Sequence, residues 1–197
     1  DSDSERLEVL RALARLQEEQ LADLGGATET YLRIRELQED DSASLDSLAR
    51  IHRARGSWAD LASVLRQQLE SVQSESRRVP LMFELAEIQA NRLQETDDAV
   101  EGFLAVLAID GSHRPSVEAL ETVRQADPST SLAVMRGLLP YYQRVEDRPK
   151  EAEAMETIVA TAAENPDHLS YALDVASRSK SPRSGQLLLE HAGDRSY

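Results

Sequence analysis

The 197-residue sequence has no cysteine, which excludes disulfide bonds, thiolate metal ligands and a cysteine nucleophile. Aromatic residues make up only 4 %, and there are 8 glycines and 7 prolines. The sequence is rich instead in Ala, Leu, Glu, Arg and Gln, which favour helices over sheets. No window shows the alternating Val, Ile and Thr of a strand hairpin. The sequence therefore predicts an all-α fold.

Long apolar runs are also missing. The most apolar stretch, residues 103–109, is far shorter than the roughly 20 residues that span a bilayer. No signal peptide is visible, so we expect no membrane partner and favour a cytoplasmic location. The sequence begins at Asp1 rather than Met. We interpret it as an excised or processed piece, in which the targeting signals of a larger protein need not be present.

Positive charge is scarce. The sequence has 22 Lys and Arg against 36 Asp and Glu, a net charge of −14 at pH 7. Repulsion from phosphates opposes nucleic acid as the main partner, whereas a basic protein partner is mildly favoured. The simplest interpretation of the acidity is that it keeps an exposed helical surface soluble.

Motifs for catalysis and cofactor binding are missing as well. The pair Gly25-Gly26 stands in neither a GxGxxG nor a GK[ST] context. The four histidines are scattered, without HExxH or an i,i+4 pair for a metal, and no serine lies in GxSxG. Acidic pairs such as Asp40-Asp41 are more simply helix caps. We predict no catalytic residue, no metal site and no cofactor.

What the sequence does contain is a long internal repeat, which aligns residues 6–57 with 78–129 at a constant offset. The identical pairs include Arg6/Arg78, Leu13/Leu85, Ala14/Ala86, Leu21/Leu93, Ala27/Ala99, Leu32/Leu104, Ser44/Ser116, Leu48/Leu120, Ala54/Ala126 and Ser57/Ser129. Matched apolar pairs such as Tyr31/Phe103 and Ile34/Val106 keep the register between them. Internal repetition of helical units indicates an α-solenoid, a class that mostly binds other macromolecules.

The apolar periodicity predicts a single domain, residues 1–197, of about 10–11 helices paired in antiparallel hairpins. The expected hairpins are 4–38, 42–73, 77–110, 114–145 and 148–179, followed by a terminal helix 184–192.

Turn and cap signals mark the helix ends. We expect Ser4 to cap the first helix and Asp40-Asp41-Ser42 to cap the third. Gly56 suits a helix C-terminus and Ser57 the N-cap that follows. Pro140 should begin a helix or kink one.

A shorter pattern lies in the second hairpin, Leu48-Ala49-x-x-His52-x-x-x-Gly56-x-Trp58-x-x-Leu61-x-x-x-Leu65. It resembles the tetratricopeptide repeat family, and Leu13-Ala14 with Tyr31 and Leu85-Ala86 with Phe103 fit the same pattern. The resemblance covers residues 6–126. Two residues depart from it, since the family has a small residue where Glu121 stands and a large apolar one at Gly137. A HEAT-like helical-pair solenoid is the structural alternative.

The resemblance implies a right-handed superhelix whose concave groove, lined by the first helix of each hairpin, binds a partner protein. The residues at the family's groove positions are Arg11, Arg15, Glu18, Glu19, Asp46, Arg50, Arg53, Phe83, Glu87, Asn91, Glu118, Thr122 and Gln125. The Lys/Asn set with which chaperone-adaptor members hold a C-terminal carboxylate is missing, so that activity is not implied. Phe83 is either an exposed aromatic of the groove or a core residue. His52 and Trp58 are expected to pack in the structure rather than to bind.

Three classes of function remain. The sequence favours an interaction scaffold that binds a peptide or helix of a partner protein. The first alternative is a self-associating or regulatory module of a larger protein, because solenoid ends without polar caps can stack. The second is an enzyme, which no constellation of residues supports.

Overall fold

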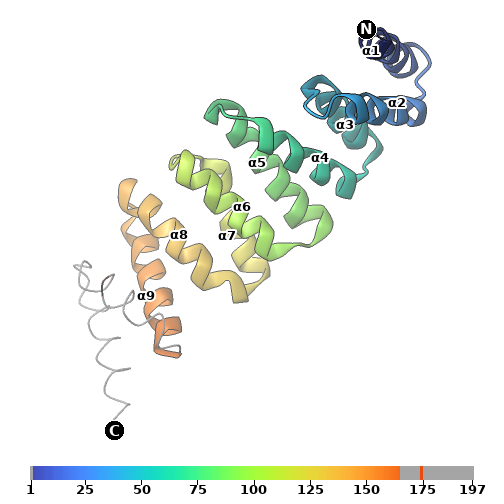
Figure 1. The fold of residues 1–197 in the computed structure, drawn as a ribbon. Coiled ribbons are helices and arrows are strands. Elements are labelled where there is room, and N and C mark those ends of the chain that lie inside the picture. Colours follow the sequence, from blue (N-terminus) through green and yellow to red (C-terminus); the bar gives the residue numbers. More distant parts are fainter. Residues whose placement is uncertain (1, 165–173, 175–197) are drawn as a thin grey trace. The chain divides into compact units, whose positions relative to one another are not determined.

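The computed structural model describes residues 2–164 and residue 174, and the secondary structure of these residues is helical, without a strand (Figure 1). The predicted all-α class is confirmed for this part of the chain. Its elements are α1 (Ser2–Arg15), η1 (Leu16–Gln20), α2 (Leu24–Leu37), α3 (Ser42–Arg55), α4 (Trp58–Ser71), α5 (Glu75–Ile88), η2 (Gln89–Leu93), α6 (Thr96–Ile109), α7 (Arg114–Ala126), η3 (Pro128–Thr130), α8 (Ser131–Arg144) and α9 (Arg148–Glu164).

Two parts of the prediction lie outside the described residues. They are the second half of the hairpin expected over 148–179 and the terminal helix expected over 184–192.

The chain forms two compact units, residues 1–95 and 96–197. In unit 1, each of the helices α1 to α4 packs against the helix that follows it. In unit 2, α6 packs against α7 and α8, α7 packs against α8, and α8 packs against α9. Within each unit, short connections thus make helices that are neighbours in the sequence packing partners as well.

The internal repeat of the sequence is also a repeat of the helix boundaries. When residues 6–57 are aligned with 78–129, both ends of α2 coincide with the ends of α6, and the first residue of α3 coincides with that of α7. Two π-helical turns, η1 and η2, follow the first helix of each repeat. The repeat therefore includes an irregular turn as well as the regular helices.

Each π-helical turn is closed by the same unusual backbone geometry. The N–H of Asp23 donates to the carbonyl of Gln17 at 2.8 Å, and the N–H of Glu95 donates to that of Gln89 at 3.0 Å. The residues before the donors, Ala22 and Gln94, have φ of 52° and 59°, in the left-handed region that side chains other than glycine rarely adopt.

The predicted caps are partly confirmed. The Asp41 carboxylate accepts from the N–H of Ser44 at 2.9 Å, as an N-cap does, and Gly56 ends α3 with φ of 68°. Ser57 is the residue before α4, but its side chain makes no capping hydrogen bond. The cap predicted at Ser4 is wrong, because α1 begins at Ser2 and the described helix already includes Ser4.

Pro140 does not begin a helix, because it lies inside α8. It removes the N–H that would bond the carbonyl of Arg136, four residues earlier. Both residues lie on the exposed side of α8. Helix α8 can therefore continue through the proline.

The core of unit 1 joins large aliphatic side chains to small ones. Ala14, Ala27, Ala62 and Ala86 are all completely buried. Ala14 and Ala86 form one identical pair of the repeat, and Ala27 belongs to another. A methyl group at a helix contact lets the two backbones come close together, while Leu and Ile fill the space on either side. Small residues at these positions therefore set the distance between neighbouring helices.

The packing of α8 in unit 2 accounts for the glycine at position 137, where the tetratricopeptide pattern has a large apolar residue. A Cβ at this position of α8 would collide with the side chain of Leu104 on α6. The close approach of Leu104 to α8 thus favours glycine, where the resemblance implied a large apolar residue.

We expect Gly137→Leu to lower the free energy of unfolding by about 1–3 kcal/mol, because the added side chain overpacks the contact with Leu104. Chemical denaturation of the full chain measures the loss, and Leu104→Ala in the same chain should restore part of it. Ala133→Leu, at an exposed position of the same helix, is the control and should change stability by less than about 0.5 kcal/mol. An unchanged midpoint in Gly137→Leu would contradict the packing role.

Candidate functional site

Two of the predicted groove residues of unit 1, Glu18 and Arg50, bind each other. The carboxylate of Glu18, on η1, accepts hydrogen bonds from Nε of Arg50 at 2.7 Å and from the Tyr31 hydroxyl at 2.9 Å. The Glu18 side chain is only 11 % exposed, and burial raises the pKa of the Tyr31 hydroxyl. Arg50 lies on α3, so this cluster ties the turn after the first helix to the third.

A second ion pair joins α3 to α5, a later helix of unit 1. Nε of Arg53, on α3, donates to the carboxylate of Glu84, on α5, at 2.7 Å. Glu84 was not among the predicted site residues. The signal that could have found it is a spacing of opposite charges close to one hairpin, since Glu18 precedes Arg50 by 32 residues and Arg53 precedes Glu84 by 31.

Arg11 has a structural role in the turn before α3. Its guanidinium donates to Gln38 at 2.9 Å and to the capping carboxylate of Asp41 at 2.6 Å. Burial alone would raise the pKa of Asp41, but the hydrogen bonds from Ser44 and Arg11 outweigh it and hold the pKa below its ordinary value. Asp41 therefore stays ionised at neutral pH and anchors the turn.

Five other predicted residues of unit 1 are exposed or partly exposed. Arg15, Glu19, Glu87 and Asn91 are exposed on α1, η1, α5 and η2, respectively. Phe83 is only partly exposed, so it does not stand out from the surface as an aromatic anchor.

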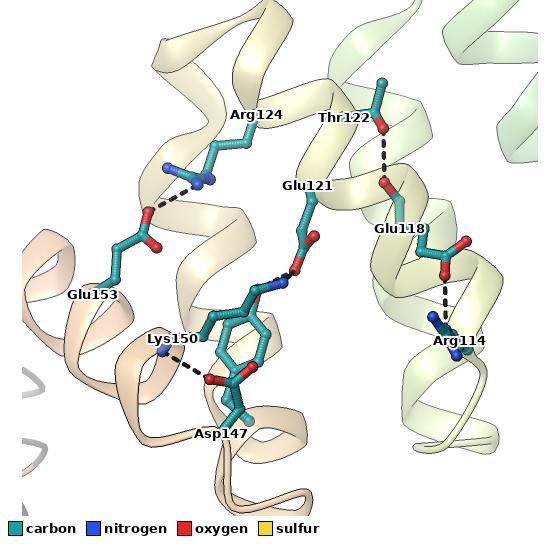
Figure 2. A network of polar contacts seen from close by, with 9 residues as sticks. Arg114, Glu118, Glu121, Thr122, Arg124, Asp147, Lys150 and Glu153 are labelled. Carbon is teal, nitrogen blue, oxygen red and sulfur yellow. Dashed lines mark hydrogen bonds and ion pairs between the residues drawn. The ribbon is translucent and has the colours of Figure 1, made fainter.

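In unit 2, the predicted residues Glu118 and Thr122 make contacts within their own helix, as Figure 2 shows. Glu118 pairs with Arg114 at 2.8 Å, and the Thr122 hydroxyl donates to the carbonyl of Glu118 at 2.8 Å. Gln125, on the same helix, is exposed. These predicted residues therefore lie on the solvated side of α7.

Two neighbouring side chains of α7 reach the later helices instead. Glu121 accepts from the Tyr142 hydroxyl on α8 at 2.8 Å and pairs with Lys150 on α9, while Arg124 pairs with Glu153 on α9 at 2.9 Å (Figure 2). Burial, reinforced by Glu121, raises the pKa of Tyr142 strongly. Glu121, which departs from the family pattern, thus serves as a partly buried acceptor rather than as a small residue at a helix contact.

Unit 1 also contains a cleft of about 550 Å³ between α3, α4 and α5. It is lined by Ser42, Leu45, Asp46, Gln68, Ser71, Val72, Gln73, Ser74, Ser76, Arg77, Pro80 and Leu81. Asp46, one of the predicted site residues, accepts a hydrogen bond from Nε2 of Gln68 at 2.6 Å. The volume falls in the range of small-ligand sites, and the lining includes polar groups.

His52 and Trp58 support the fold, as predicted. The His52 side chain is 12 % exposed, with Nδ1 3.8 Å from the Asp60 carboxylate. Trp58 is partly buried against the core of unit 1, and the guanidinium of Arg92 lies 4.8 Å from the centre of its ring. Neither side chain points to a catalytic role.

Within residues 2–164, no group of three or more His, Asp or Glu side chains is arranged to hold a metal ion. None of the helices in this part of the chain is both long and apolar enough to cross a bilayer. Comparison of the sequence with family models and with curated proteins found no match.

We expect the imidazole of His52 to titrate below its ordinary pKa of about 6.5, because burial disfavours its charged form and Arg55 repels it, with only Asp60 opposing. Since the folded-state pKa is lowered, the neutral ring contributes stability above about pH 6.5 that is lost as the pH falls through the folded-state pKa. Titration of the ring by NMR measures the pKa.

The matching stability experiment compares the free energy of unfolding at about pH 7.5 and about pH 5.5 in the wild type and in His52→Gln. The loss of stability on acidification should be smaller in the variant. An NMR pKa at or above about 6.5 would show that the ring is not held neutral by burial.

Proposed function

We propose that the chain is a tetratricopeptide-like, right-handed α-solenoid that acts as an interaction scaffold rather than as an enzyme, and that it binds a peptide or a helix of a partner protein. The observation that carries this proposal is the repeat of helix boundaries, in which α2 aligns with α6 and α3 with α7. Repeated helical pairs build extended surfaces, and such surfaces mostly serve macromolecular recognition.

Contacts between the first helices of successive hairpins support this proposal. In unit 1, side chains of α3 reach both η1 and α5 through Glu18–Arg50 and Arg53–Glu84. In unit 2, side chains of α7 reach α9 through Arg124–Glu153. First helices that lie side by side in this way are what a helical solenoid requires.

From these ion pairs we infer two roles for the predicted binding residues. Arg11, Glu18, Arg50 and Arg53 hold neighbouring helices together, so a partner meets their charge already partly neutralised. The exposed side chains next to them, Arg15, Glu19, Glu87 and Asn91, are better placed to bind. Charges at the edge of an interface mainly set its orientation and association rate.

We expect exchange of the charges in Arg53→Glu/Glu84→Arg to preserve the fold and to reduce partner binding, because the pair remains but its positive end moves from α3 to α5. The single reversal Arg53→Glu should lower stability by about 1 kcal/mol or less, since both side chains are partly exposed. Capture of partners from lysate, followed by mass spectrometry and a binding titration with the recovered partner, measures the effect.

The control is a second charge exchange, Arg148→Glu/Glu151→Arg, which alters a pair on α9 that is not among the predicted groove residues. It should bind like the wild type. Equal binding by the wild type and by both exchanged variants would reject Arg53 and Glu84 as part of the binding surface.

A second candidate function, self-association, is favoured by an apolar stripe on the first helical segment. Val9, Leu13 and Leu16 are 66 %, 39 % and 41 % exposed. The equivalent residues of the second repeat, Leu81, Leu85 and Ile88, pack against the core of unit 1, where α4 covers α5. The stripe therefore has the character of a helix interface without its second helix, and a second copy of the chain would cover it.

If two copies associate through this stripe, we expect Val9→Asp/Leu13→Asp to yield a monomer at concentrations where the wild type is a dimer. Sedimentation equilibrium over a range of concentrations measures the mass. Leu32→Asp, at an exposed leucine of α2, is the matched control and should leave association unchanged. A wild-type chain that remains monomeric at all concentrations would exclude self-association.

A further inference from the structure

The cleft of unit 1 combines apolar surface with one carboxylate. Leu45, Val72, Pro80 and Leu81 supply the apolar surface, and Asp46 supplies a carboxylate. A ligand that fits both has an aliphatic portion and a group that donates hydrogen bonds. Long basic side chains have this form, because their methylene groups pack on apolar surface while the charged end binds acceptors.

Gln68 gives the cleft a second, less common feature. Its side chain lines the cleft and is 7 % exposed, and its Oε1 is buried without a hydrogen-bond partner. The orientation of the amide is fixed by Asp46, because the carboxylate can accept from Nε2 and not from Oε1. A buried acceptor without a donor costs free energy, which a donor group of a ligand would recover.

Pro80 leaves another acceptor in the same cleft. Proline has no N–H, so the carbonyl of Ser76, four residues earlier in α5, lacks its usual helical donor. Ser76 and Pro80 both line the cleft. The carbonyl of Ser76 is therefore a further acceptor that an N–H group of a ligand can serve.

The second repeat shows how the chain itself satisfies the equivalent carboxylate. Glu118 is the residue that the repeat aligns with Asp46, and its partner is the guanidinium of Arg114. In the first repeat the residue equivalent to Arg114 is Ser42, which lines the cleft and has no positive charge. The first repeat therefore has the carboxylate without the arginine.

We propose that the cleft between α3, α4 and α5 binds the guanidinium group of an arginine side chain carried by a partner polypeptide. The proposal rests on the scaffold function proposed above and names one contact of its partner. A guanidinium has five N–H donors in a planar fork, enough to serve the Asp46 carboxylate and the Gln68 Oε1 together. Its methylene groups lie along Leu45 and Val72, and the net charge of −14 favours the approach of a basic segment.

Arg77 also lines the cleft and opposes a cationic ligand. Its charge therefore gives the proposal an unusual prediction. Removal of this side chain's charge should strengthen binding, whereas removal of the Asp46 charge should weaken it. A variant that gains affinity cannot owe its effect to unfolding.

The test uses the full chain and three probes, Nα-acetylarginine amide, the lysine analogue and the neutral citrulline analogue. Binding is followed by NMR through the side-chain amide signals of Gln68, and through backbone amide signals of the cleft in the variant that lacks this amide. We expect the arginine probe to bind at least tenfold more tightly than citrulline and more tightly than lysine. Asp46→Asn and Gln68→Leu should each weaken it at least tenfold, and Arg77→Gln should strengthen it severalfold.

Asp60→Asn, at an exposed carboxylate that does not line the cleft, is the matched control and should bind like the wild type. Equal affinity for arginine and citrulline, or unchanged binding in Asp46→Asn, would overturn the proposal. A partner recovered from lysate that binds Asp46→Asn as well as the wild type would reject the cleft while leaving the scaffold function intact. If the chain captures no partner protein but still binds the arginine probe, the scaffold function is rejected and the cleft proposal stands.

Discussion

An isolated helix shorter than about 12–15 residues is only marginally stable in water, and most of the helices described in this chain are close to that length. Each one therefore depends on the apolar face that it buries against its neighbour. The completely buried alanines, Ala14, Ala27, Ala62 and Ala86, allow this burial because they bring neighbouring helices close enough for the larger side chains to interlock. The need to bury an apolar face against a neighbouring helix thus explains both the fold and its repetition, because the same arrangement of small and large side chains serves in both repeats.

The polar surface obeys a weaker constraint. Ion pairs such as Arg53–Glu84 are partly exposed, so they add little to the free energy of folding. Their contribution is to orientation, because a guanidinium bound to a carboxylate on the next helix fixes the side-chain positions at that contact. A surface ordered in this way loses less conformational entropy when a partner binds.

The sequence allowed the helical class and several helix ends to be predicted because these depend on local chemistry. Asp41 and Gly56 occupy positions where an N-cap and a left-handed C-terminal residue have strong preferences. The π-helical turns could not be predicted in this way. Their left-handed residues are Ala22 and Gln94, neither of which is a typical signal for that conformation.

The candidate site was harder to predict, because its contacts join residues about one hairpin apart. Arg50 and Arg53 were predicted as groove residues. The spacing of residues cannot distinguish an arginine that faces a partner from one that pairs with a carboxylate of the same chain, as these two do with Glu18 and Glu84. The cleft around Gln68 was missed altogether. A buried acceptor without a donor is a property of three-dimensional packing and has no counterpart in the spacing of residues.

The π-helical turns are an irregular feature that the two repeats have in common. A π-helical turn is rare and appears mostly as a single turn within an α-helix. Both repeats close the turn through the carbonyl of a glutamine, Gln17 in one and Gln89 in the other. The departure from regular α-helix is therefore part of the repeated unit, because it occurs at matching places in both repeats.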